Sequence, residues 1–214
     1  HIISDGWSVR VFFDELSAFY QHDKPNLPDL SVNYPDYAHW QRQNFQGVWL
    51  QQQLEFWQQQ VRDRDPLQLP LDYPRPATPS LQGAVYHHTL DSVLSEAVKH
   101  LATTQESTLF MVLLTAFQVF LARQSGQEDF CVGSPVSGRQ RAESHHLIGF
   151  FANTLALRAR VRPDQSFLTL LKSVRAHCVD AFSHPDLPFE MLVDVLNVTR
   201  NTGQTPIFQV MFSV

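Results

Sequence analysis

HIISDGWS (residues 1–8) places a histidine four positions before an Asp5-Gly6 turn, and a serine directly ahead of an amphipathic run. Apolar residues then recur at helical spacing from Val9 to Tyr20, which predicts a helix, and Ser8 is of a type that caps a helix N-terminus. A neutral imidazole at His1 can take a proton from an amine or hydroxyl near neutral pH. The spacing alone is weakly specific, because a histidine beside a helix-capping Asp5 would show the same pattern.

The composition is that of an ordinary globular protein. Of its 214 residues, 43% are hydrophobic, 12% aromatic and 17% charged, with a net charge of −5. No Lys/Arg run suited to nucleic acid is present. The most apolar segment, Leu109 to Leu121, is shorter than the roughly 20 residues that span a bilayer, and no signal peptide is visible. These features predict a cytoplasmic protein that binds neither nucleic acid nor membrane. Cys131 and Cys178 lie in apolar runs and are expected to be reduced core thiols.

Helical and strand patterns alternate along the second part of the chain, which predicts an α/β fold. A proline-rich stretch, residues 62–80, separates residues 1–61 from residues 81–214 and is expected to be a linker between two lobes. Helices are predicted over residues 35–45, 50–61, 94–101, 109–125, 167–182 and 188–196, with caps at Thr108, Gly126 and Ser166. Strands are predicted over residues 85–89, 129–133, 155–161 and 206–214.

Other chemistry-bearing residues form no recognisable centre. The pairs His87-His88 and His145-His146 are adjacent in sequence and suit surface positions better than a metal site, and no Cys/His/Asp/Glu cluster has zinc-like spacing. Arg158, Arg160 and Arg162 are predicted on one strand face, either solvated or as a docking patch for an acidic partner. Phosphate-binding loops and the G-x-S-x-G motif are absent. The residues alone therefore indicate an α/β protein with a candidate histidine-dependent transfer reaction.

Six stretches, taken together and in order, resemble motifs of the condensation domains of nonribosomal peptide synthetases, which are relatives of chloramphenicol acetyltransferase. The first, HIISDGWS, is similar to the family's HHxxxDG signature without its first histidine. The others are YPDYAHW (34–40), VGSPVSGR (132–139), IGFFANTLALR (148–158), HPDLPFE (184–190) and TPIFQVMF (205–212).

The resemblance implies two chloramphenicol-acetyltransferase-like lobes with a tunnel between them. Residues 1–61 would be the end of the N-terminal lobe and residues 81–214 most of the C-terminal lobe. Two peptidyl carrier proteins would deliver thioesters on 4'-phosphopantetheine arms, and the acceptor amine would attack the donor thioester to form an amide. An adenylation domain would neighbour the domain in the same synthetase. No metal or directly bound cofactor is implied.

Particular residues take roles from the same resemblance. His1 matches the histidine assigned to the reaction, as a general base or as the group that holds the amine and stabilises charge. Asp5 matches a structural ion-pair residue of the active-site loop, Gly6 supplies its turn, and Asn153 matches an asparagine near the tunnel. The SDGWS form is similar to domains that join an L-donor to an L-acceptor.

The sequence also departs from the family pattern. The first histidine of the signature, most of the N-terminal lobe and the end of the last strand are not matched, so this polypeptide alone is expected to be inactive. Asn201 and Gln204 stand where the family has an aspartate and an arginine. Three alternatives remain open: an epimerising relative, against which Gly6-Trp7-Ser8 argues; an ester-forming relative; and a non-catalytic carrier-protein docking module that uses the Arg158, Arg160 and Arg162 face.

Overall fold

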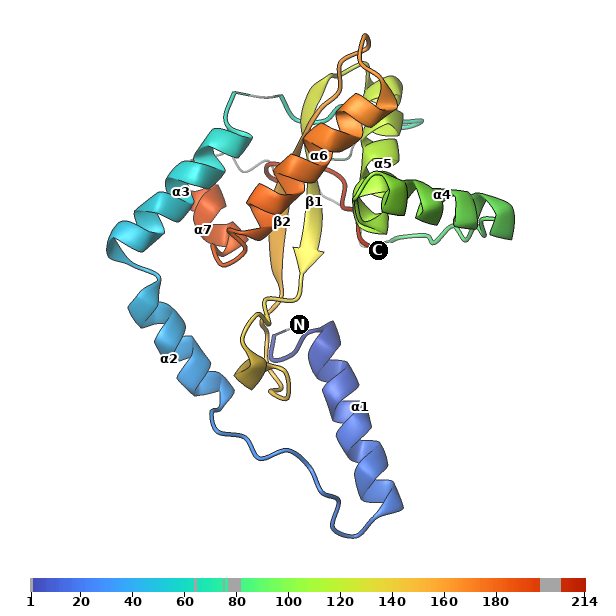
Figure 1. Ribbon diagram of the computed structural model, residues 1–214. Helices are drawn as coiled ribbons and strands as arrows, with labels where there is room; N and C mark the ends of the chain where they lie inside the picture. Colours follow the sequence, from blue (N-terminus) through green and yellow to red (C-terminus); the bar gives the residue numbers. More distant parts are fainter. Residues whose placement is uncertain (1, 64, 75, 77–81, 197–204) are drawn as a thin grey trace.

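The computed structural model describes residues 2–63, 65–74, 76, 82–196 and 205–214. Its elements in chain order are α1 (Gly6–Gln21), α2 (Tyr34–Asn44), α3 (Gly47–Val61), α4 (Ser92–Thr104), α5 (Leu109–Ser125), β1 (Asp129–Val136), the 3₁₀ turn η1 (Ala142–Ser144), β2 (Asn153–Arg160), α6 (Phe167–Phe182) and α7 (Phe189–Val195) (Figure 1). All predicted helices are confirmed.

The two strands form the centre of the molecule. They pair antiparallel over their full length, from Asp129 opposite Arg160 to Val136 opposite Asn153. The strand predicted over residues 206–214 is wrong as a full strand: among the described residues it contributes a single parallel bridge, between Gly133 and Met211. Among the described residues, the amide of Gly133 donates to the carbonyl of Val210 and the amide of Phe212 donates to the carbonyl of Gly133, and the pairing goes no further.

The predicted strand over residues 85–89 is also wrong. This segment is irregular, and its side chains are exposed, with Val85 79% and Tyr86 89% accessible. β-branched and aromatic residues favour strands when they pack on a half-buried surface, and no such surface lies beside this segment in the part of the chain that the structure describes.

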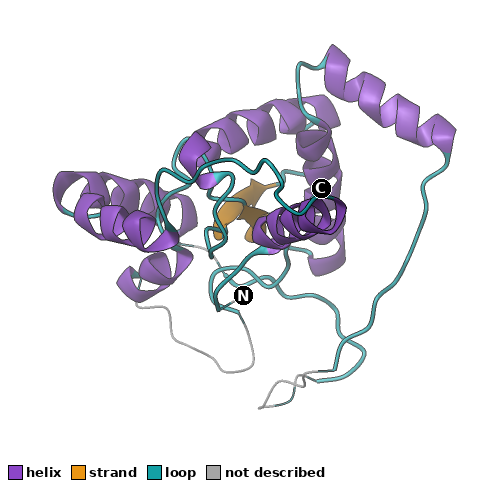
Figure 2. Ribbon diagram, turned by 90° about the horizontal axis from the view of Figure 1, so that it is seen from below, coloured by secondary structure: helices purple, strands orange, loops and turns teal. Residues whose placement is uncertain are grey.

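Helices surround the two strands and bury them (Figure 2). The core joins Phe130 and Leu157 of the sheet to Leu114 of α5 and Leu171 of α6, all almost fully buried. Trp57 of α3 closes another side, where its indole Nε1 donates to the carbonyl of His184 at 2.9 Å. Because both strands are covered, they can carry the loop between them as a rigid platform.

Local signals set the helix ends within this core. Thr108 accepts a hydrogen bond from the amide of Met111 at the start of α5, and Gly126 ends that helix in the left-handed conformation. Ser166 caps α6 through the amide of Thr169. These three predicted caps are confirmed. Cys131 and Cys178 are buried, neither forms a disulfide, and burial raises the pKa of Cys178 to about 12.

The first turn of α1 lies against the loop between β1 and β2, and the rest of the helix extends away from the core (Figure 1). Within the described residues, no single helix is long and apolar enough to cross a membrane; α4 and α5 meet that criterion only as a pair, bent by 108°. The Pro-rich stretch has no helix or strand in its described part, although Leu67 is buried there.

Candidate active site

The Asp5-Gly6 turn is the N-terminal cap of α1. Asp5 has extended backbone angles, φ −125° and ψ 179°, and its carboxylate Oδ1 accepts from the amide of Ser8 at 2.8 Å. The cap predicted at Ser8 is therefore wrong. Both residues have the chemistry of a cap, and Asp5 fills the role because its extended backbone places the carboxylate over the free amides of the first turn.

Ser8, freed from capping, joins two distant parts of the chain. Its hydroxyl lies 2.8 Å from both Asp5 Oδ1 and the carbonyl oxygen of Gly149, to which it can donate. The same oxygen accepts from the amide of Gly149 at 3.0 Å and from Arg139 Nη2 at 2.7 Å. A small buried hydroxyl thus links α1 to the loop between the two strands.

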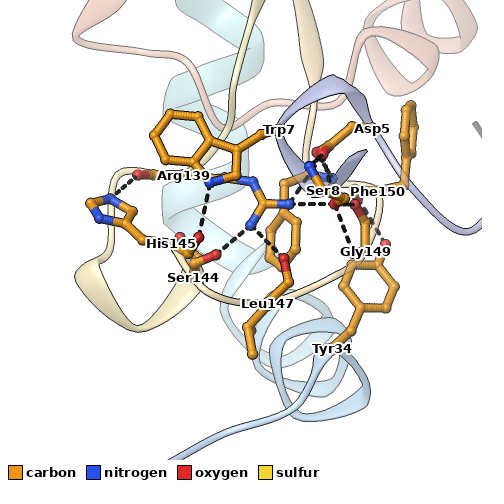
Figure 3. A network of polar contacts seen from close by, with 11 residues as sticks. Asp5, Trp7, Ser8, Tyr34, Arg139, Ser144, His145, Leu147, Gly149 and Phe150 are labelled. Atoms are coloured by element: carbon orange, nitrogen blue, oxygen red, sulfur yellow. Dashed lines mark hydrogen bonds and ion pairs between the residues drawn. The ribbon is translucent and has the colours of Figure 1, made fainter. Parts of the chain in front are cut away.

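Arg139 is the centre of this network, which Figure 3 shows. Its side chain has no solvent exposure, and Asp5 is only 3% exposed. Nη2 lies 3.1 Å from Asp5 Oδ1, while Nη1 donates to the carbonyls of Ser144 and Leu147. The guanidinium also lies 4.1 Å from the centroid of the Phe151 ring. Burial of both charges is tolerated because each is paired and hydrogen-bonded.

The carboxylate of Asp5 is held in its ionised form. Burial by itself would raise the pKa of Asp5, but hydrogen bonds from Ser8, Phe151 and Arg139 outweigh it and hold that pKa below its usual value. The bond from the amide of Phe151 to Oδ2 measures 3.0 Å. Asp5 is therefore an anchor that stays charged, and it is unsuited to giving or taking a proton near neutral pH.

Two aromatic side chains complete the junction (Figure 3). The indole of Trp7 donates to the carbonyl of His145 at 2.8 Å, and the hydroxyl of Tyr34 at the start of α2 donates to the carbonyl of Phe150 at 2.8 Å. His145 Nε2 lies 3.0 Å from the carbonyl of Arg139. The loop between the strands is thus held by α1 on one side and by α2 on the other.

Two glycines allow this close packing. Gly138 has a φ of +64°, and a Cβ there would overlap the carbonyl oxygen of Phe151. A Cβ on Gly149 would overlap the ring of Tyr34. Both positions therefore require glycine: Gly138 for its conformation and for space, and Gly149 for space alone.

A cavity of about 260 Å³ lies beside the network. Residues of four motif stretches that are far apart in sequence line it: Tyr34 and Tyr37 from YPDYAHW, Gly138 from VGSPVSGR, Phe150 to Thr154 from IGFFANTLALR, and Pro185, Asp186 and Pro188 to Glu190 from HPDLPFE. Gln41 is on the lining as well. Phe151 is shared by the cavity wall and by the Asp5 anchor.

Asn153 lines this cavity and fastens its far wall. Its Nδ2 donates to the carbonyls of Pro185 at 2.8 Å and Leu187 at 2.7 Å. Its Oδ1 accepts from the amides of Thr154 and Phe189. All the hydrogen-bonding capacity of the amide is used by backbone groups, so Asn153 shapes the wall of the cavity.

The structure describes some of the site residues predicted from sequence and leaves others outside the described residues. Asp5 belongs to the network and Asn153 to the cavity beside it, whereas Gly6 is the first residue of α1, has no positive φ, and would have open space around a Cβ. His1 lies outside the described residues, as do Asn201 and Gln204. Sequence reasoning missed Arg139 and Tyr34 as site residues, although the first ends VGSPVSGR and the second begins YPDYAHW.

Arg158, Arg160 and Arg162, predicted on one strand face, do not form a shared solvated face. Arg158 is half-buried, its Nη2 and Nε bind both oxygens of Asp129 at 2.6 and 2.7 Å, and Nη1 donates to the carbonyl of Gln60. Arg160 is exposed at the strand end and Arg162 lies beyond it. The histidines at 87, 88, 145 and 146 are exposed, and the described residues contain no group of three potential metal ligands.

Comparison with known proteins places this geometry in a family. The family described as "Condensation domain" matches residues 1–214. The chain is 48% identical to a linear gramicidin synthase of Brevibacillus parabrevis and 40% identical to a surfactin synthase of Bacillus subtilis (strain 168). These matches cover 99% and 100% of this chain but 3% and 6% of those relatives.

Solved structures show the same fold. The X-domain from teicoplanin biosynthesis superposes with a TM-score of 0.89 at 24% identity, over 98% of this chain and 49% of that one. A four-domain nonribosomal peptide synthetase bound to AMP and glycine gives 0.86 at 23% identity, over 97% and 16%. The first condensation domain of the calcium-dependent antibiotic synthetase gives 0.74 at 23% identity, over 92% and 44%.

Proposed function

The chain belongs to the condensation-domain family of nonribosomal peptide synthetases, and on that premise we propose that it forms amide bonds between carrier-bound thioesters. Condensation domains are acyltransferases of these synthetases. Here the donor is an acyl or peptidyl thioester and the acceptor an aminoacyl thioester, both of L configuration. Gly6-Trp7-Ser8 after the signature Asp5 supports the L/L assignment.

The observation that carries the proposal is the convergence of four motif stretches on one cavity, with Asp5, the N-cap of α1, bonded to its wall. The wall includes Phe151, whose amide donates to Asp5. It also includes Tyr34, whose hydroxyl donates to the carbonyl of Phe150 on the same wall. A reaction that joins two large tethered substrates needs such a fixed loop, because rate depends on the reacting atoms being held at near-attack distance.

In the reaction, the acceptor amine attacks the carbonyl carbon of the donor thioester. The C–N bond forms, the C–S bond breaks, and the thiolate leaves on the donor arm. The amine gives up one proton, which His1 takes as general base and returns to the departing thiolate, so that the step balances without another reactant. In the alternative role, His1 holds the amine and stabilises charge in the transition state.

The partners follow from the same proposal. Two peptidyl carrier proteins present the substrates on 4'-phosphopantetheine arms, and an adenylation domain of the same synthetase loads the acceptor. The resemblance to peptide synthases and to a solved multidomain synthetase supports this setting. The arms are substrate carriers, so the chain itself needs no resident cofactor for the step above.

The test uses the full-length protein with two loaded carrier proteins, one bearing an acylated L-amino acid and the other an L-aminoacyl group. Intact-mass spectrometry should show that the acceptor carrier gains the mass of the donor acyl group while the donor carrier loses it. Release of the donor as a free acid with an unchanged acceptor would contradict the proposal. Replacing the acceptor by its α-hydroxy analogue, and the donor by its D form, tests ester formation and the L/L assignment.

The arginine face that suggested a non-catalytic docking module is not formed as expected. Arg158, the central residue of the supposed docking face, is committed to Asp129 and to the carbonyl of Gln60. Arg160 is exposed at the end of β2, and Arg162 lies beyond the strand.

A further inference from the structure

A second cavity, of about 290 Å³, adjoins the first. Tyr37, Gly138 and Asp186 line both cavities and therefore form the wall between them. The second cavity is completed by Trp40, Gln140, Arg141 and Ser144. Gly138 has no side chain, so the polar groups that this wall offers to a ligand come from Tyr37 and Asp186.

Asp186 has no protein partner in the described part of the chain. Its carboxylate accepts no hydrogen bond and forms no ion pair there, although the residue is half-buried. Burial raises the pKa of this carboxyl, and the nearby Arg141 lowers it only in part. The guanidinium of Arg141 lies over the Trp40 ring at 4.2 Å and lines the second cavity together with Asp186, but no ion pair joins the two among the described residues. A partly buried carboxylate without a partner is unfavourable for the fold and suits a ligand that supplies the missing charge.

The first cavity is negative as a whole. Its described lining contains two carboxylates, from Asp186 and Glu190, and no lysine, arginine or histidine. The rings of Tyr34 and Tyr37 stand on the same lining, and aromatic faces attract cations. An anionic ligand group would be repelled by the carboxylates and a neutral donor would gain only a hydrogen bond, whereas an ammonium group would gain from both the carboxylate and the rings.

We propose that Asp186 and Tyr37 bind the ammonium group of the acceptor substrate before it reacts; the ammonium then releases one proton to solvent and becomes the neutral amine that attacks the thioester. This inference rests on the proposed function, because the α-ammonium is the cation that every aminoacyl acceptor carries, while an acylated donor has lost it. An ammonium has three N–H donors and no acceptor. The carboxylate of Asp186 and the phenol oxygen of Tyr37 supply acceptors for them.

The position of this site fits that use. Tyr37 is one helical turn from Tyr34, whose hydroxyl donates to the carbonyl of Phe150, and Phe150 and Phe151 line the same cavity. The amide of Phe151 donates to Asp5 in the loop that follows His1. The wall that would hold the amine is therefore continuous with the wall to which Asp5 is bonded.

The experiment measures binding by calorimetry to the full-length protein, without turnover. The probes are glycyl-aminopantetheine and propionyl-aminopantetheine, in which an amide replaces the thioester, so that they differ mainly by an ammonium in place of a methyl group. The wild type should bind the glycyl probe about tenfold more tightly, the size of a charged hydrogen bond that remains partly exposed. Asp186→Asn should remove this preference and Tyr37→Phe should reduce it.

Glu143→Gln is the matched control, because it removes one negative charge from an exposed position in the neighbouring η1 turn, outside both cavities. It should keep the full preference for the glycyl probe. Melting temperatures of all three variants establish that each is folded. A wild type without the preference, or a folded Asp186→Asn variant that retains it, would overturn the proposal.

The outcome separates this inference from the proposed function. If the preference is present and depends on Asp186 but loaded carriers give no amide, the ammonium site stands and the proposed reaction fails. If amide forms while Asp186→Asn binds both probes as the wild type does, the reaction stands and the site fails. A 5-aminopentanoyl probe that loses affinity in Asp186→Asn while the glycyl probe does not would assign the site to a side-chain amine and overturn the α-ammonium assignment.

Discussion

Replacing Arg139 by methionine should loosen Asp5 and the first turn of α1 from the loop between β1 and β2. The methionine keeps most of the buried volume but removes the charge that faces Asp5 and the donors to Ser8, Ser144 and Leu147. Loss of one partner of a buried ion pair costs about 3–5 kcal/mol, because the other charge stays buried and uncompensated. Asp5 keeps hydrogen bonds from the amides of Ser8 and Phe151, so the lower end, about 3 kcal/mol, is expected.

That loss has both a global and a local consequence. For a unit of this size, about 3 kcal/mol corresponds to a fall in melting temperature of about 6–12 °C. Locally, the amides of Ser8 and Phe151 donate to Asp5 and should exchange with solvent faster in the variant. Calorimetry and hydrogen–deuterium exchange on the full-length protein measure the two effects, and single-turnover amide formation should slow in parallel with the exchange.

The control is Arg175→Met. Arg175 pairs with Glu106 at 3.3 Å, but their side chains are 42% and 81% exposed, so the change should cost less than about 1 kcal/mol. Arg139→Lys should resemble Arg139→Met, since an ammonium cannot reproduce the guanidinium geometry. An Arg139→Met variant that melts no lower than Arg175→Met, with unchanged exchange at Ser8 and Phe151, would refute the reasoning.

Three further changes have expected outcomes. The pKa of Asp186 is raised by burial, so its ionised form opposes folding: Asp186→Asn should raise the melting temperature at pH 7, and the difference should vanish in acid, once pH falls below the usual carboxyl pKa of 3.8. The pKa of His177 is lowered by burial and by Arg160, and its neutral Nε2 accepts a hydrogen bond from the amide of Arg158. Because the unfolded chain takes up a proton at this histidine more readily than the folded one, the stability of the protein should decline as pH falls below 6.5. His177→Gln should flatten that decline in pH-dependent melting curves. Gly138→Ala should displace the loop between β1 and β2, seen as a lower melting temperature and slower amide formation, whereas Gly83→Ala, where a Cβ meets nothing within 4 Å, should change neither.

Sequence reasoning succeeded where the deciding interaction is local. Thr108 begins α5 and Gly126 ends it, each through a contact within one helical turn, so the residue types alone predict both ends. It failed at α1, where Asp5 and Ser8 are three residues apart and both have capping chemistry. Only the tertiary fold decides between them, because the hydroxyl of Ser8 donates to the carbonyl of Gly149 and accepts from Arg139, both of which are distant in sequence.

The site itself depends on pairings that no local pattern contains. Asp5 and Arg139 are 134 positions apart, and their ion pair exists because the loop after β1 returns beneath the first turn of α1. The arginine alternation after Leu157 correctly predicts β2, but it could not show that Arg158 is bound by Asp129 on the neighbouring strand. The resemblance identified the stretches that matter, and the structure supplies the contacts that join them.

The central claim is that the segment leading into α1 is anchored through Asp5 and that His1, which precedes it in sequence, acts on the acceptor amine as proposed. The most direct measurement is single-turnover transfer between loaded carrier proteins by full-length His1→Ala, compared with His100→Ala on the exposed face of α4. The account predicts that His1→Ala slows transfer by about 10²–10⁴-fold, the usual contribution of a positioned proton acceptor, while its melting temperature matches that of His100→Ala. Transfer by a folded His1→Ala variant at the wild-type rate would contradict it.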